Sequence, residues 1–235
     1  MMRIFDFLEL HDLALYIPEH KALVISDLHV GYEAALNKQG LFVPRLAFRD
    51  LMRRLKRIID SVEVRVVVVN GDLKHEFGSI SDQEWRDSLK VLDLLLERSE
   101  RVVLIRGNHD TVLGPIAEKR RVGVVDSFSF GSVFICHGHI VPEIPAGADV
   151  VIIGHAHPAV SVDDGIRSEK FKCFLAGAWK GKKLVVQPSF NLVTAGTDVL
   201  SERLLSPFLE RDLSDFDIYI VEDRVYDFGK VRSLL

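Results

Sequence analysis

Residues 101–110 read Arg-Val-Val-Leu-Ile-Arg-Gly-Asn-His-Asp, and the rest of the chain is organised around them. Their first six residues form a short run that is β-branched and apolar in the middle, which predicts a buried strand. We expect Gly107 to end the strand and turn the backbone, because glycine tolerates angles that other residues resist. An amide, an imidazole and a carboxylate follow at once, in Asn108, His109 and Asp110. Taken alone, this stretch fits a polar turn as well as it fits a functional site.

Three further apolar runs end in the same kind of side chain. The run at 22–26 leads into Asp27-Leu28-His29, the run at 66–69 into Asn70-Gly71-Asp72, and the run at 150–153 into Gly154-His155-Ala156-His157. Ligands of open α/β sheets bind at the carboxyl ends of parallel strands. Four strand ends that carry Asp, Asn or His therefore favour a functional site over a set of polar turns.

Length and composition limit the class of protein. The 235 residues fit one α/β domain over 1–235, and 48% hydrophobic residues are enough for a full core. A net charge of -4 argues against a globally basic surface that coats nucleic acid, although it allows a local basic strip. Cys136 and Cys173 form no spacing motif for a metal site or a disulfide framework. The N-terminus is unlike a signal peptide. No apolar run reaches the roughly 20 residues that a membrane helix needs. We expect a reduced, cytoplasmic protein that makes no use of a membrane.

Helices are predicted at three places. Pro44 suits the first turn of a helix that runs to Ile59, and an arginine recurs on its outer side every four residues, at Arg45, Arg49 and Arg53. This basic stripe has two interpretations, a solvated helix face or a surface for substrate phosphates. Ser81 and Glu84 form a capping box at the start of a second helix. A third helix is predicted over 201–213.

Most of the histidines lie at or just after predicted strand ends: His29, His75, His109, His137, His139, His155 and His157. Together with Asp27, Asp72 and Asn108 they favour a metal site over scattered core histidines. Donors of nitrogen and oxygen without thiolate point to manganese, iron or catalytic zinc rather than structural zinc. The ligands are too many for one ion, so we expect two ions that share a carboxylate, an arrangement that clamps phosphate and activates water.

The order of these motifs resembles the calcineurin-like metallophosphoesterase superfamily. The motifs are Asp27-x-His29, Gly71-Asp72, Gly107-Asn108-His109-Asp110, His137-Gly138-His139 and Gly154-His155-x-His157. The stretches 26–33 and 71–77 are similar to those of small archaeal and bacterial phosphoesterases related to the SbcD nuclease, some of which accompany DNA-repair ligases. The resemblance implies a four-layer αββα sandwich, in which two mixed β-sheets lie face to face with helices outside.

The resemblance also implies roles for single residues. Asp27, His29 and His157 would bind one metal ion, and Asn108, His137 and His155 the other, with Asp72 shared by both. His109 would protonate the leaving oxygen or stabilise the transition state, and Asp110 would orient His109. His75 stands where many relatives carry a carboxylate. The candidates for contacts with substrate or with the ligands are His75, His139, Asn191, Arg45, Arg49 and Arg53.

The function that follows is hydrolysis of phosphodiester bonds in the processing or repair of DNA or RNA. We expect it to use two divalent ions, manganese first and iron or zinc as alternatives. One alternative is a phosphohydrolase of small molecules, such as cyclic nucleotides, phosphomonoesters or nucleotide pyrophosphates. Another is a non-catalytic scaffold, since the superfamily includes a membrane-coat subunit that has lost much of its metal chemistry. The presence of every expected ligand and of His109 places the scaffold last.

Overall fold

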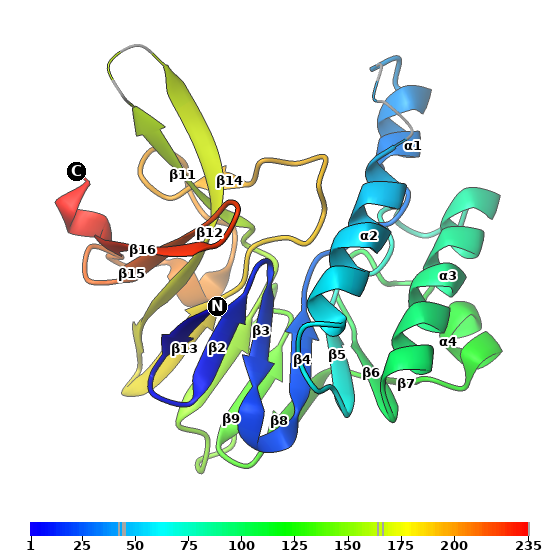
Figure 1. Cartoon of the computed structure of the whole chain (residues 1–235), viewed down its shortest axis with the longest axis horizontal. Helices are drawn as coiled ribbons and strands as arrows, with labels where there is room; N and C mark the ends of the chain where they lie inside the picture. Colours follow the sequence, from blue (N-terminus) through cyan, green and yellow to red (C-terminus); the bar gives the residue numbers. More distant parts are fainter. Residues whose placement is uncertain (42, 44–45, 164, 166, 235) are drawn as a thin grey trace.

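A seven-stranded sheet forms one half of the computed structural model, which describes residues 1–235 except 42, 44–45, 164, 166 and 235 (Figure 1). Its strands, in spatial order, are β1 (Met2–Ile4), β2 (Leu8–His11), β3 (Ala14–Ile17), β4 (Ala22–Ile25), β5 (Val66–Asn70), β6 (Arg101–Ile105) and β7 (Gly123–Val125). β1 to β4 pair antiparallel, whereas β4 to β7 pair parallel. β6 lies between β5 and β7, so the apolar run that begins at Arg101 is an interior strand, as predicted.

The second sheet has nine strands. They are β8 (Ser127–Phe130), β9 (Val133–Cys136), β10 (Val150–Ile153), β11 (Pro158–Asp163), β12 (Ser168–Trp179), β13 (Lys182–Val186), β14 (Thr197–Asp198), β15 (Asp217–Val221) and β16 (Val225–Lys230). β10 is parallel to both β9 and β13, whereas β12 is antiparallel to β11, β13 and β15. The sheet is therefore mixed, like the first.

Side chains alternate between two hydrophobic cores along the central strands of the second sheet. Val150 and Ile152 of β10 pack in the core between the two sheets, whereas Val151 and Ile153 pack in a second core on the opposite face. This alternation is the period of two that a strand imposes. Because both faces are buried, the run reads as continuously apolar in the sequence. Cys136 and Cys173, both free thiols, lie in the second core.

Four α-helices follow the parallel strands of the first sheet, and Figure 1 shows them together on one side of the molecule. They are α1 (Tyr32–Lys38), α2 (Ala47–Ile59), α3 (Asp82–Arg98) and α4 (Gly114–Arg120). The predicted capping box opens α3: the Ser81 hydroxyl accepts from the Glu84 amide at 3.2 Å, and the Glu84 carboxylate accepts from the Ser81 amide at 3.0 Å. The predicted class, two mixed sheets with helices outside, is confirmed.

The predicted helix over 201–213 is wrong. The segment holds only a 3-10 turn, η2 (Pro207–Leu209), because proline has no amide hydrogen and disfavours helical angles in the residue before it. Ser206 is accordingly extended, at φ -81 and ψ 132. Leu204, Phe208 and Leu209 still pack into the second core, so this segment covers the outer face of the second sheet without being an α-helix.

Candidate metal centre

The predicted motifs meet at one edge of the molecule. β4, β5 and β6 run parallel in the first sheet, as do β9 and β10 in the second, so their carboxyl-terminal loops gather there. Backbone hydrogen bonds join the first two loops, from the Asp27 amide to the Gly71 carbonyl (3.1 Å) and from the His29 amide to the Asp72 carbonyl (2.9 Å). The His155 amide donates to Oδ2 of Asp27 at 3.0 Å and ties the two sheets together.

Five of the predicted ligands have a left-handed backbone. The φ angles are 56° for Asp27, 44° for His29, 48° for Asp72, 62° for His155 and 46° for His157. Such a conformation costs a residue with a side chain about 1–3 kcal/mol and persists where the surroundings fix it. Backbone strain therefore coincides with the candidate ligands, as is common at functional sites.

The first donor cluster consists of Asp27, His29 and His157, whose donor atoms all lie within 4.8 Å of one another. Nε2 of His157 lies 3.1 Å from Oδ1 of Asp27 and 3.3 Å from Nε2 of His29. Ligands about 2.0–2.2 Å from one tetrahedral ion are separated by about 3–3.5 Å. These separations fit a shared cation.

The second cluster consists of Asp72, His137 and His155. Nε2 of His137 lies 3.4 Å from Oδ2 of Asp72 and 3.1 Å from the side-chain oxygen of Asn108. The same Oδ2 of Asp72 lies 3.7 Å from Nε2 of His29, in the first cluster. The Asp72 carboxylate therefore stands between the two clusters.

The burial of the donors also fits a cation. Oδ1 of Asp27 is inaccessible to solvent and accepts no hydrogen bond from the described residues, although His157 lies beside it. A buried carboxylate oxygen without a donor is costly unless a positive charge faces it. The donor set of imidazole, carboxylate and amide is consistent with a dinuclear site.

The protonation states of the candidate histidine ligands depend on their burial and on the nearby carboxylates of Asp27 and Asp72. Burial lowers the pKa of His29 to about 3 and that of His155 to about 4, so both imidazoles are neutral near pH 7 and their nitrogens can bind metal. Burial acts in the same direction on His137, but Asp72 and Asp27 outweigh it and raise the pKa of His137 to about 9. For Asp27 burial raises the pKa, but the neighbouring histidines lower it more, so it remains below its usual value.

His109 lies beside the clusters, with its ring centre 4.8 Å from that of His29, and it is held from two sides. Its Nδ1 hydrogen-bonds the carbonyl oxygen of His75, and its amide donates to Oδ1 of Asp72 at 2.8 Å. Nε2 lies 4.0 Å from Oδ2 of Asp72 and so faces the clusters.

Asp110 does not orient the His109 ring, contrary to the implied role, because the His75 carbonyl is the partner of Nδ1. The buried Asp110 carboxylate instead accepts from the backbone amides of Gly107, Leu73 and Lys74, at 3.1, 3.4 and 3.5 Å. Burial raises the pKa of Asp110 to about 6. Asp110 therefore joins the loops after β5 and β6.

Gly107 is needed for a different reason from the one expected. Its φ is not in the left-handed region. A Cβ at this position would lie 2.1 Å from Oδ1 of Asp72 and 2.4 Å from the Asp72 amide nitrogen, contacts that real side chains do not make. Glycine here lets the β6 loop approach the shared carboxylate.

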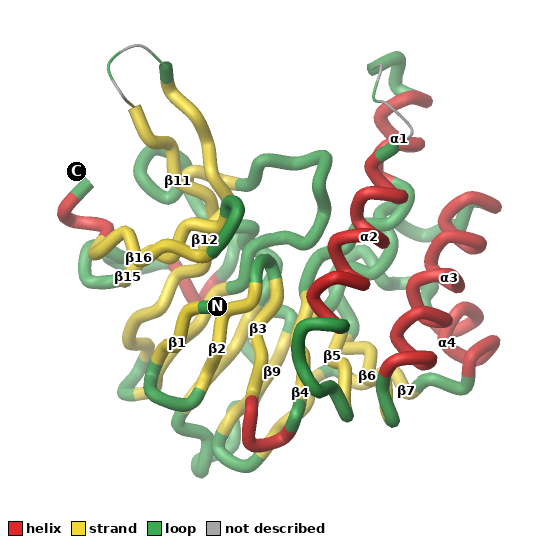
Figure 2. Tube along the Cα trace, viewed as in Figure 1, coloured by secondary structure: helices red, strands yellow, loops and turns green. Residues whose placement is uncertain are grey.

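The remaining candidates surround the clusters. The His75 ring lies 5.5 Å from that of His29, and the His139 ring 5.2 Å from that of His137, between ring centres. Asn191 donates from its amide to the carbonyls of Leu28 (3.0 Å) and His29 (3.3 Å). Figure 2 shows its loop, after β13, reaching across toward α2. Asn191 therefore supports the loop that carries two of the ligands.

Two buried residues behind the His109 loop were missed from the sequence. Nζ of Lys74 donates to the carbonyls of His109 (2.8 Å) and Glu76, and Lys74 is fully buried. The Glu84 carboxylate accepts from the amides of His75 (3.2 Å) and Glu76 (2.7 Å), in addition to closing the capping box. The sequence feature that relates to Glu84 is the glycine at position 31, because a Cβ there would lie 2.2 Å from the Glu84 side chain.

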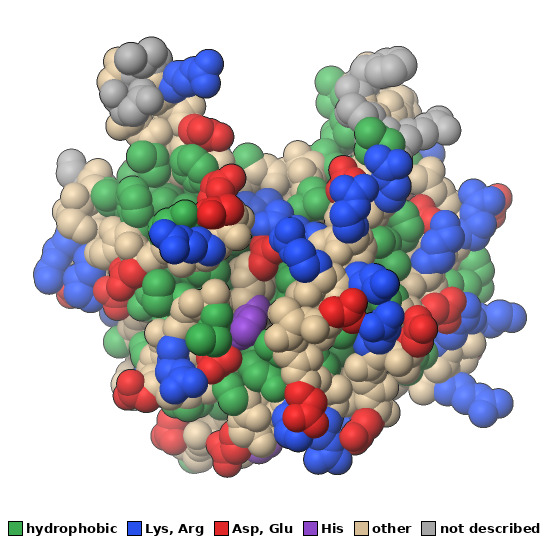
Figure 3. Space-filling view, in the orientation of Figure 1, with side chains coloured by type: hydrophobic (Ala, Val, Ile, Leu, Met, Phe, Trp, Pro, Cys, Tyr) green, Lys and Arg blue, Asp and Glu red, His purple; other side chains and the backbone are tan. Residues whose placement is uncertain are grey.

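The basic stripe is only partly described. Arg45 lies outside the described residues, whereas Arg49 and Arg53 are exposed on α2 and contact Asp50 at 3.9 and 3.2 Å. Figure 3 shows Lys and Arg side chains along this face. Ala47, Phe48 and Leu51 line a small pocket together with residues of the 28–33 loop, so the first turns of α2 adjoin the ligand loop.

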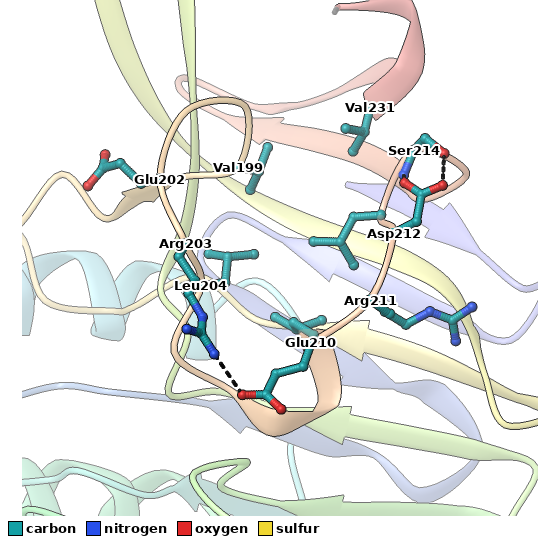
Figure 4. Close-up of a pocket in the computed structure, with 11 residues that line it drawn as sticks. Val199, Glu202, Arg203, Leu204, Glu210, Arg211, Asp212, Ser214 and Val231 are labelled. Carbon is teal, nitrogen blue, oxygen red and sulfur yellow. Dashed lines mark hydrogen bonds and ion pairs between the residues drawn. The ribbon is translucent and has the colours of Figure 1, made fainter.

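A separate cavity of about 400 Å³ lies at the 199–214 segment (Figure 4). Among its lining residues, Arg203 pairs with Glu210 at 3.0 Å, and the Asp212 carboxylate accepts from the amide and hydroxyl of Ser214. None of the candidate ligands lines it. The cavity is therefore set apart from the metal centre.

Comparisons with known proteins give the family. The model of the calcineurin-like phosphoesterase family matches residues 20–167. Among solved structures, the chain is similar to the Pseudomonas putida nuclease MPE, with 23% identity, a TM-score of 0.68 and coverage of 97% of this chain and 98% of that one. No curated protein was found to match the chain.

Two other solved structures are less similar. A single mutant of Vps29 from Entamoeba histolytica has 17% identity and a TM-score of 0.37, with coverage of 88% of this chain and 99% of that one. A protein of unknown function from Aquifex aeolicus has 17% identity and a TM-score of 0.38, with coverage of 58% of this chain and 78% of that one.

No helix within the described part of the chain is long and apolar enough to cross a membrane. Since the family model spans more than half of its length, the chain belongs to the calcineurin-like phosphoesterase family.

Proposed function

We propose that this chain is a dinuclear-metal-dependent phosphodiesterase that cleaves nucleic acid during repair or processing. The observation that supports the proposal best is the position of the Asp72 carboxylate. Its Oδ2 lies 3.7 Å from Nε2 of His29 and 3.4 Å from Nε2 of His137, one in each donor cluster. A carboxylate placed in this way can serve two ions at once.

We assign the ligands as the family resemblance implies. One ion would be held by Asp27, His29 and His157, and the other by Asn108, His137 and His155, with Asp72 shared. We expect manganese, with iron and zinc as alternatives, because the donors are nitrogen and oxygen without thiolate. Bound ions of this kind activate a water for attack on phosphorus and offset the charge of the phosphate oxygens.

His109 is assigned to the leaving oxygen. The carbonyl of His75 can only accept a hydrogen bond, so Nδ1 of His109 carries a proton. Nε2 remains free to hold a second proton on the side of the clusters and to donate it as the P–O bond breaks.

Two features favour a polynucleotide over a small molecule. The exposed Arg49 and Arg53 lie on the helix whose first turns adjoin the His29 loop, where phosphates of a longer substrate could pass. A solved structure that covers almost the whole chain, with a TM-score of 0.68, is that of a nuclease. Both features concern the substrate and leave the metal chemistry unchanged.

A comparison of three substrates tests the proposal. Nicking of a plasmid, hydrolysis of bis(4-nitrophenyl) phosphate and hydrolysis of 4-nitrophenyl phosphate are measured with manganese and again with EDTA. We expect metal-dependent turnover of the plasmid and the diester, and much slower turnover of the monoester. Preferred turnover of the monoester would support a small-molecule phosphohydrolase, and failure of all three would support a scaffold.

A further inference from the structure

We infer that a row of aromatic rings beside the metal centre binds the base of the leaving nucleoside, with Phe77 as its main contact. The inference rests on the proposed phosphodiesterase function. It specifies where the leaving half of the substrate lies and which chemical group is recognised there.

The row contains four rings from three segments, which are the start of α1, the loop after β5 and the loop after β6. Between ring centres, Tyr32 lies 4.3 Å from His75, His75 lies 5.3 Å from His109, and His109 lies 3.8 Å from Phe77. The successive interplanar angles are 39°, 29° and 34°. The rings are thus closer to parallel than to perpendicular, and they follow one another in a row that ends at Phe77.

Phe77 is the most accessible ring of the row, with 59% of its surface exposed. Its loop is nonetheless fixed on both sides. Lys74 donates to the Glu76 carbonyl, Glu84 accepts from the Glu76 amide at 2.7 Å, and the Gly78 amide donates to the Thr111 hydroxyl at 3.2 Å. A large apolar ring is therefore held in water at a defined position, in contact with the proposed general acid.

The position of Phe77 determines which part of the substrate reaches it. If His109 protonates the leaving oxygen, the group bonded to that oxygen must extend past His109, where Phe77 lies. Phe77 offers no charge or hydrogen-bond donor to a sugar or phosphate, but it can stack with a flat base. Stacking of one base on an aromatic side chain changes affinity by about 5- to 150-fold and depends little on which base it is.

A cycle of enzyme variants and substrates tests the inference. The substrates are thymidylyl-thymidine and the same dinucleotide with an abasic sugar on the leaving side, each assayed for kcat/KM with manganese. We expect Phe77→Ala to lower kcat/KM about tenfold or more on the intact dinucleotide and hardly at all on the abasic one. Phe77→Trp should keep the activity on the intact dinucleotide. Phe7→Ala, an exposed phenylalanine in the β1–β2 turn, is the matched control and should change neither.

The outcomes separate the inference from the function on which it rests. Equal losses on both dinucleotides, or no loss on either, would overturn the subsite, because the ring would then only support His109 or do nothing. Wild-type protein that hydrolyses the nitrophenyl diester but neither dinucleotide would also overturn it, while phosphodiesterase activity stands. Wild-type protein that is inactive on all of these substrates would contradict the proposed function itself.

Discussion

The two sheets contribute to the metal centre in different ways. The loops of the first sheet carry His109 as well as ligands, and buried polar side chains hold these loops from behind: Lys74, Glu84 and Asp110. The loops of the second sheet carry His137, His155 and His157. The difference teaches that the first sheet both supplies candidate ligands and positions His109, whereas the second mainly supplies nitrogen donors.

The largest effect is expected at the point where the two halves meet. Asp72→Asn weakens a side chain that lies between the donor clusters, so both ions should be affected. We expect kcat/KM on the nitrophenyl diester to fall by more than the roughly 10–100-fold typical of a residue that only supports a ligand. Bound manganese, measured after desalting, should fall from two ions per chain toward one or none.

A control for this variant is Asp215→Asn, because Asp215 is exposed and pairs only with Arg232 at 2.8 Å in the described part of the chain. It should retain full activity and two ions. An Asp72→Asn protein that still binds two ions tightly would contradict the shared role.

The next largest effect separates chemistry from ligation within the first sheet. His109→Ala should leave manganese binding nearly intact, because His109 is assigned to the leaving oxygen. Turnover of a dinucleotide, whose alkoxide leaving group needs a proton, should fall by about 10²–10⁴-fold. Turnover of the nitrophenyl diester should fall much less, since nitrophenolate leaves without protonation. Equal losses on the two substrates would argue against the acid role.

A smaller effect is expected where a loop of the second half supports the first. Asn191→Ala removes the hydrogen bonds to the Leu28 and His29 carbonyls, which help to hold the strained Asp27–His29 loop. Manganese affinity, measured by titration calorimetry, should fall about 10–100-fold, as for other groups that orient ligands.

The matched control for Asn191→Ala is Asn37→Ala, which removes side-chain hydrogen bonds to the Glu33 and Val43 carbonyls at the end of α1. It should leave manganese affinity unchanged. If the two variants lost affinity equally, the effect would come from general loosening of the protein.

The ligands were predictable because they adjoin apolar runs whose parallel ends must converge. Asp27, Asp72 and His155 each follow such a run within a few residues. Lys74 and Glu84 were not predicted in their roles, since their partners are backbone groups brought close only by the fold. The orientation of His109 by a carbonyl rather than by Asp110 has the same origin: any residue can supply a carbonyl, so the sequence carries no mark of it.

The local signals failed where two of them competed. The segment 201–213 was predicted to be helical, but Pro207 outweighed that expectation and the chain forms only a 3-10 turn. The helix predicted to run from the Pro44 turn to Ile59 does end at Ile59, and Leu51, Leu55 and Ile58, which recur at helical spacing, form its buried face. What its outer face does cannot follow from periodicity, which describes the buried side alone.

The smallest effect tests that outer face and extends the comparison beyond the metal centre. Arg49→Gln with Arg53→Gln keeps the helix propensity of α2 and removes two positive charges. If the stripe guides a polynucleotide, affinity for nucleic acid should fall for all sequences, and the slope of log K against log salt should decrease by about 0.7–0.9 per lost contact. Hydrolysis of the nitrophenyl diester should not change, because that substrate is too small to reach α2.

The control pair is Arg203→Gln with Arg232→Gln, two exposed arginines outside α2 that give the same change in charge. Equal salt slopes for the two double variants would mean that the stripe is a solvated helix face and that the first sheet acts on substrate through its loops alone.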